Sequence, residues 1–95
     1  MGEKEIYCKI LEDSIGRWNR RIEELEAALA KADGEQKEKH LKHLQELHRI
    51  GEQMKAGLCE IRKAEDHEWQ SLKERADQIR AELEKSVDYP ISRMR

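Results

Sequence analysis

Apolar residues recur in alternating steps of three and four along the first third of the chain. They are Cys8, Leu11, Ile15, Trp18, Ile22, Leu25, Leu29 and Ala32. This spacing is that of the a and d positions of a coiled coil, and it predicts a helix over about residues 5–32. The helix should offer one narrow apolar stripe, the seam, to a neighbouring helix.

A second helix is predicted after a short turn at residues 33–34. Asp33 favours turns and Gly34 can adopt a positive φ, and both stand where the first repeat stops. Beyond the turn the repeat resumes at Leu41, Leu44, Leu47, Gly51, Met54, Leu58 and Ile61. Because so short a turn makes two helices antiparallel neighbours, the predicted fold class is all-α, an antiparallel coiled-coil hairpin of about residues 5–32 and 35–86.

The two stripes match layer by layer when the hairpin closes at the turn. The facing pairs are Cys8 with Ile61, Leu11 with Leu58, Ile15 with Met54, Trp18 with Gly51, Ile22 with Leu47, and Leu25 with Leu44. The layer of Trp18 and Gly51 joins the largest side chain to the residue that has none. This keeps the volume of that layer near that of its neighbours and explains a glycine in the middle of a helix.

The helical pattern continues beyond the end of this pairing, over residues 66–87. Its apolar positions are Trp69, Leu72, Ala76, Ile79, Leu83 and Val87. Two arrangements would cover this stripe: the second helix runs on and pairs with another copy of the chain, or residues 66–87 fold back as a third helix. We favour the first, a symmetric dimer overlapping through residues 58–87, because Ile6, Tyr7 and Ile10 widen the apolar face at the open end of the hairpin. Either way the chain forms one domain, with a helix over 35–65 before residues 66–87 and a tail at 88–95.

Composition narrows the classes of partner. Of the 95 residues 42% are charged, yet the formal net charge is only −2, which argues against a general attraction to nucleic acid. No secretory signal and no apolar run long enough to span a membrane is visible, so a cytoplasmic location is expected. In that compartment Cys8 and Cys59 should stay reduced.

Motifs typical of enzymes are missing, and we expect neither catalytic residues nor a cofactor. One weak metal-binding candidate is the pair His40 and His43, one turn apart on the second helix, with Glu26 opposite in the predicted pairing. Another alternative is a lipid-surface helix over 66–87, although its acidic residues cancel its basic ones and argue against strong membrane binding.

The chain resembles a family of small, uncharacterised bacterial coiled-coil proteins. The resemblance rests on three elements of the family. They are Trp-x-x-x-Ile-x-x-Leu, matched by Trp18, Ile22 and Leu25; Leu-x-x-Leu-x-x-Ala, matched by Leu58, Ile61 and Ala64; and Ala-Trp-x-x-Leu-Lys, matched by Trp69, Leu72 and Lys73. This chain departs from the family in having Glu68 in place of the small residue before Trp69, and Arg80 where a second tryptophan is usual. The family has no assigned activity, so the resemblance implies a coiled-coil fold and no chemistry.

The sequence therefore predicts a non-enzymatic structural or protein-interaction protein. It would self-associate, most simply as a homodimer, or dock a partner helix, with flanking charges selecting the register. The predicted interaction anchors are Trp69, Leu72, Ile79 and Leu83.

Overall fold

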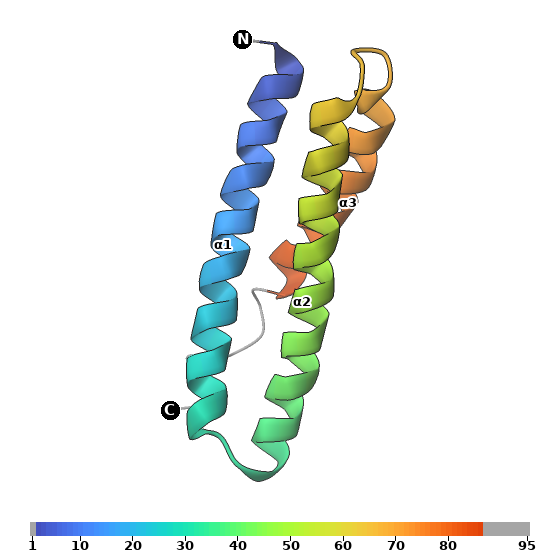
Figure 1. Ribbon diagram of the computed structural model, residues 1–95. Helices are drawn as coiled ribbons and strands as arrows, with labels where there is room; N and C mark the ends of the chain where they lie inside the picture. The colour runs from blue at the N-terminus through green and yellow to red at the C-terminus, as the bar shows by residue number, and fades with distance from the viewer. Residues whose placement is uncertain (1, 87–95) are drawn as a thin grey trace.

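The computed structural model describes residues 2–86, which form three helices: α1 (Glu3–Lys31), α2 (Gly34–Lys63) and α3 (Trp69–Ser86). α1 and α2 are antiparallel neighbours, and α3 returns along the half of the hairpin that holds the N-terminus (Figure 1). The molecule measures 50 × 19 × 17 Å. The all-α fold class is confirmed, whereas Val87 and the predicted tail at 88–95 lie outside the described residues.

The core between α1 and α2 lies along the predicted seam. Its buried members are Cys8, Leu11, Trp18, Ile22, Leu25, Leu47, Gly51, Met54, Leu58 and Ile61. Ile15 and Leu44 are half-buried against this core, and Leu41, near the tip of the hairpin, is 40% exposed. Ile50 and His40 are also buried, although neither belongs to the seam.

The turn between α1 and α2 depends on a glycine. Ala32 and Asp33 are extended, and Gly34 has a φ of 60°. That left-handed conformation is costly for residues with a Cβ atom. The turn lies where the sequence predicts it, and it leaves the whole length of both helices free to pair.

The favoured prediction for residues 66–87, a straight continuation of the second helix, is not what the structure has. α2 ends at Lys63, two residues before the predicted end of that helix, and Ala64 is extended with a ψ of 148°. The chain reverses over 64–68, and α3 follows as the third helix of the alternative prediction. The physical reason is that folding back buries the apolar stripe of α3 within the same chain.

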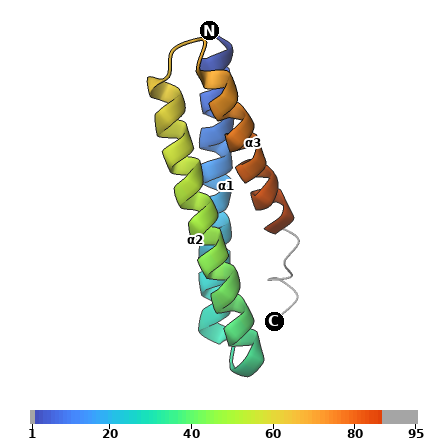
Figure 2. The same cartoon turned by 90° about the vertical axis from the view of Figure 1, so that its right-hand side faces the viewer.

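α3 is covered by residues from both other helices. Its buried residues are Trp69, Ala76 and Leu83. On α1, Tyr7 and Ser14 lie beside the seam and are 5% and 0% exposed, because α3 packs over that side of α1. Figure 2 shows α3 running down beside α2 with α1 behind them. Ile6 and Ile10, which the sequence also assigned to a wider face, are instead 48% and 39% exposed.

Candidate interaction site

The four predicted anchors divide into two pairs in the folded chain. Trp69 and Leu83 are 6% and 3% exposed and belong to the core. Leu72 and Ile79 are only half-buried, so part of each side chain still faces solvent. The anchors lie on one helix as predicted, and Leu72 and Ile79 are the two with the more exposed side chains.

Leu72 and Ile79 line a groove of about 370 Å³ between α2 and α3. The α2 side of this α2–α3 groove carries Ala56, whose side chain is one methyl group, and Gly57, which has no side chain. A Cβ atom added to Gly57 would meet no atom within 4 Å. The apolar part of its lining consists of Ala56, Gly57, Leu72, Ala76 and Ile79, and the rest of the lining is polar or charged.

Charged residues border the groove. At one end Arg49 pairs with Glu82 of α3 at 2.6 Å and also with Glu46 of its own helix. Hydrogen bonds to these two carboxylates raise the pKa of Arg49. The groove also carries Glu60 on α2 and Arg75 on α3, and neither forms an ion pair with any residue between 2 and 86. The groove thus offers one negatively and one positively charged side chain to a second protein surface.

A polar network fixes α3 to α1 on the opposite side from this groove. The Tyr7 hydroxyl donates a hydrogen bond of 2.6 Å to the Asp77 carboxylate, which also pairs with Lys73 at 3.0 Å. Arg80 donates from Nε to the Ser14 hydroxyl at 3.0 Å and lies 3.4 Å from Asp77. The Tyr7 ring lies 6.1 Å from that of Trp69. These contacts hold α3 in one orientation.

The network shifts two pKa values. Burial, then the hydrogen bond to Asp77 and its negative charge, raise the pKa of Tyr7 to about 12, with Arg80 acting in the opposite direction. Burial would raise the pKa of Asp77 as well. Hydrogen bonds from Tyr7 and Lys73 and the charges of Lys73 and Arg80 outweigh it, so the pKa of Asp77 is lowered. The network is therefore stable with Tyr7 neutral and Asp77 ionised.

The candidate metal ligands Glu26, His40 and His43 do not form a three-residue group at ligand spacing in the described part of the chain. His40 is buried and His43 half-buried. Burial, followed by the positive charge of Arg21, lowers the pKa of His43.

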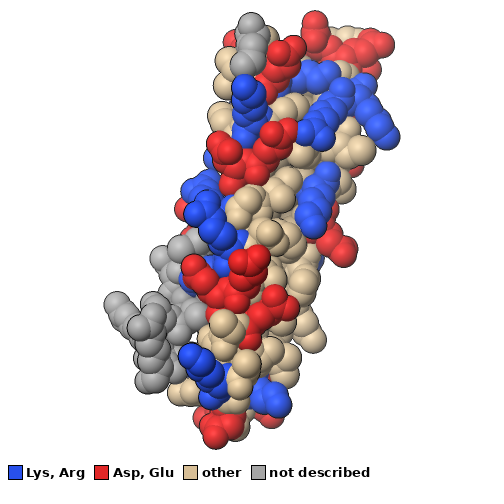
Figure 3. All heavy atoms as spheres, turned by 60° about the vertical axis from the view of Figure 1, so that its left-hand side comes forward, with Lys and Arg blue, Asp and Glu red and all other residues tan. Residues whose placement is uncertain are grey.

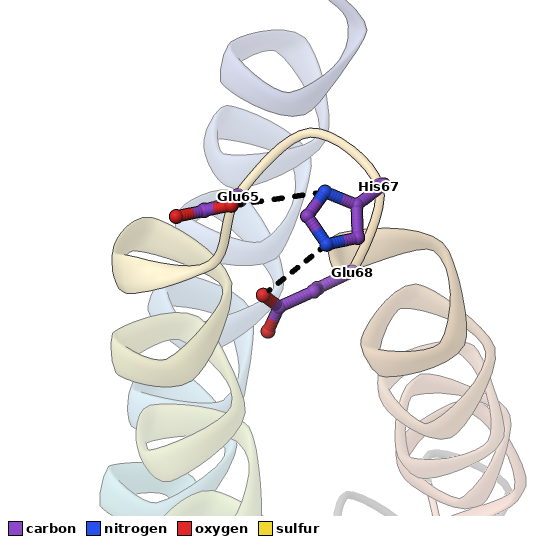
Figure 4. A group of neighbouring side chains, drawn as sticks. All are labelled: Glu65, His67 and Glu68. Carbon is purple, nitrogen blue, oxygen red and sulfur yellow. Dashed lines mark ion pairs between the residues drawn. The ribbon is translucent and has the colours of Figure 1, made fainter.

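Over residues 2–86, the one group of three that has such spacing is Glu65, His67 and Glu68 in the α2–α3 turn. Figure 4 shows the two carboxylates at different nitrogens of the imidazole. Glu65 lies 3.7 Å from Nδ1 and Glu68 lies 3.6 Å from Nε2. All three side chains are exposed, and exposed acidic groups often lie at such spacing without binding an ion.

The two cysteines are free thiols. Cys8 is buried in the seam and Cys59 is exposed on α2. Cys8 and Trp69 also line a cavity of about 660 Å³ at the open end of the bundle, together with charged residues of α1 and Arg62. Among residues 2–86, Cys8 belongs to no group of three side chains at metal-ligand spacing.

The outer surface of α1 carries both signs of charge. Figure 3 shows Lys and Arg side chains alternating with Asp and Glu along this face, without a field of one sign. Within residues 2–86, none of the three helices contains an uncharged apolar stretch of the length that a membrane-spanning helix needs.

Comparison of the chain with protein-family models, with curated proteins and with solved structures found no match. The resemblance to small bacterial coiled-coil proteins therefore stays a prediction.

Proposed function

We propose that this chain is a non-enzymatic structural protein that self-associates through its α2–α3 groove. The observation that carries the proposal is the placement of Leu72 and Ile79, which are half-buried and line the groove opposite Ala56 and Gly57. The proposed occupant of the groove is the same groove of a second copy, so that α2 and α3 of the two chains pack face to face as a four-helix bundle.

The size of the side chains supports a two-fold axis parallel to the helices. About such an axis α2 of one copy faces α3 of the other, and the two helices are antiparallel. The rotation keeps each residue at its own height, so Leu72 and Ile79 of one copy lie on either side, along the helix axis, of Ala56 and Gly57 of the other. The small residues between them let the two copies approach closely enough to cover Leu72 and Ile79.

The border charges are complementary under the same symmetry. Glu60 on α2 and Arg75 on α3 have no ion pair among residues 2–86. Facing α2 with the other copy's α3 brings Glu60 near the Arg75 of that copy, and the symmetry forms this pair twice. Exposed ion pairs add little affinity, on the order of 0–1 kcal/mol each, but they oppose wrong registers.

Sedimentation velocity of two glycine variants tests the groove. Gly57→Gln places a long side chain in the groove, whereas Gly16→Gln places it on the outer face of α1. In both variants the new Cβ has open space within the chain. Both changes remove a helix-weakening glycine and should raise the melting temperature. We expect the wild type and Gly16→Gln to form a rapidly reversible dimer at micromolar concentration, and Gly57→Gln to lack this reversible dimer. Equal dimerisation of all three, or a wild type that stays monomeric, would reject the groove.

Charge reversal tests the proposed symmetry. Glu60→Arg and Arg75→Glu should each weaken the dimer, because like charges then face each other across the interface. The double variant restores opposite charges and should recover the wild-type association. If the double variant associates no better than the single variants, this symmetry is wrong.

A further inference from the structure

The connection between α2 and α3 lacks the residues that usually reverse a chain. Residues 64–68 are Ala64, Glu65, Asp66, His67 and Glu68, without a glycine or proline. In the described residues, positive φ occurs at Gly34 in the other turn and at no residue of this connection. Alanine and glutamate favour helices strongly, so this segment is compatible with a straight helix from α2 into α3.

Few contacts within the turn oppose such straightening. The Glu65 carbonyl accepts hydrogen bonds from the backbone of Glu68 at 2.9 Å and of Trp69 at 3.3 Å, and both could be replaced by bonds of a continuous helix. Lys4 donates to the Ala64 carbonyl at the end of α2. The pairs of His67 with its neighbours are exposed, with 75% of its side chain in solvent, so water screens them. The turn is therefore held mainly by the packing of α3.

We propose that two copies of this chain can exchange α3. In each copy α2 and α3 would join into one helix of about 80 Å over residues 34–86, and α3 would pack on the α1–α2 hairpin of the other copy. Straightening exposes Trp69, Ala76 and Leu83, which are buried in the closed chain. Another copy of this hairpin is the occupant, because it carries the Tyr7 hydroxyl for Asp77 and the Ser14 hydroxyl for Arg80.

The exchanged dimer makes the same α3 contacts as the closed chain, but between copies. The difference in free energy between the two forms then depends on the 64–68 connection and on protein concentration. Exchange of α3 does not depend on dimerisation through the groove, since the exchanged form rebuilds the contact of α3 with α2 and keeps the groove residues in place. The exchanged dimer should dissociate more slowly than the groove dimer, because both α3 helices must first leave their hairpins.

The test compares two substitutions at Glu65. Glu65→Pro favours the bent form, because the residue before a proline prefers the extended conformation that Ala64 has, with φ −73° and ψ 148°. Glu65→Ala removes the same side chain and its pair with His67 while permitting a helix. Each protein is refolded at high concentration, diluted, and followed by size-exclusion chromatography. We expect a dimer that persists after dilution for the wild type and Glu65→Ala, and none for Glu65→Pro.

A second variant keeps the test decisive if Glu65→Pro fails to fold. Asp66→Ala combined with His67→Ala replaces two weak helix formers in each chain, and we expect a rise of about tenfold or more in the association constant of the persistent dimer. Gly57→Gln blocks the groove and should leave this dimer intact. The proposal is overturned if Glu65→Pro gives as much persistent dimer as Glu65→Ala, or if the alanine variant gives no increase. Loss of the persistent dimer in Gly57→Gln would assign it to the groove instead.

Discussion

The indole of Trp18 occupies the space in which a side chain of Gly51 would begin. A Cβ atom built on Gly51 would lie 2.1 Å from two carbon atoms of the indole. Trp18 also donates a hydrogen bond from Nε1 to the carbonyl of Leu47, one turn before Gly51 on α2. The missing side chain thus lets the indole reach the backbone of the facing helix, and the Lys55 ammonium lies 4.7 Å from the centre of the same ring.

Substitution of Gly51 should therefore destabilise the bundle even when the new side chain is a single methyl group. We expect Gly51→Ala to lower the free energy of unfolding by about 1–3 kcal/mol, because the indole must move and its hydrogen bond weakens. Gly51→Leu should cost at least as much. The measurement is denaturant unfolding followed by circular dichroism.

Gly16→Ala is the matched control for this prediction. Gly16 is also helical, but it is exposed and a Cβ there would meet no atom within 4 Å. Its replacement should stabilise the protein by about 0.5–1 kcal/mol through helix propensity. A Gly51→Ala protein as stable as Gly16→Ala would mean that Trp18 packs elsewhere.

The raised pKa of Tyr7 predicts a loss of stability in alkali. Its folded-state pKa of about 12 lies above the ordinary value of 10.0, chiefly because of burial and the hydrogen bond to Asp77. The stabilisation is therefore complete below the ordinary value and is lost as the pH rises through the folded value. Tyr7→Phe should lower the free energy of unfolding by about 0.5–1.5 kcal/mol at neutral pH. Between neutral and alkaline pH, the variant should then lose less stability than the wild type does.

Thermal unfolding of both proteins across the alkaline range measures this difference. The comparison cancels the titration of lysines, which both proteins share. Parallel losses in the wild type and Tyr7→Phe would contradict the neutral, buried state of the Tyr7 hydroxyl.

The sequence predicts the turn between α1 and α2 better than the turn between α2 and α3. The hairpin follows from local signals: the three-four repeat places Leu11 and Leu58 on facing stripes, and Gly34 marks the reversal. The turn at 64–68 contains no glycine or proline, and its one mark is a phase slip, since the polar Glu65 stands four residues after Ile61 and four before Trp69. Whether α3 packs on its own hairpin or on another copy is a competition between loop closure and association, which periodicity alone does not determine.

The α1–α3 contacts were also beyond sequence analysis, for a related reason. Ser14 is a polar residue outside the seam, and it is buried only because Arg80 and the rest of α3 cover it. Arg80 donates a hydrogen bond to Ser14 and pairs with Asp77 of its own helix. The signal that could have identified this contact is the run Lys73, Asp77 and Arg80 along one face of α3, a set of charges paired at helical spacings.

Acid should loosen α3 before it unfolds the hairpin. The pKa of Asp77 is lowered in the folded chain because its bonds to Tyr7 and Lys73 outweigh the opposing effect of burial. The Asp77 carboxylate therefore binds a proton more readily when α3 has detached from α1 than when it is packed against it. The stabilisation is thus present above the ordinary pKa of 3.8 and is lost as the pH falls through the folded value. α3 buries only Trp69, Ala76 and Leu83, so this loss should appear first in α3.

The measurement is the melting temperature of the wild type and of two amide variants. It is followed from about pH 6 down to about pH 2, the range in which aspartates titrate. Asp77→Asn removes the charge and should lose less stability in acid than the wild type does. Asp13→Asn is the control, since Asp13 is exposed on α1 and forms no ion pair within residues 2–86. It should follow the wild type. If Asp77→Asn also follows the wild type, the Tyr7–Asp77 hydrogen bond does not hold α3 to α1, and the apolar contacts of Trp69 and Leu83 must hold it alone.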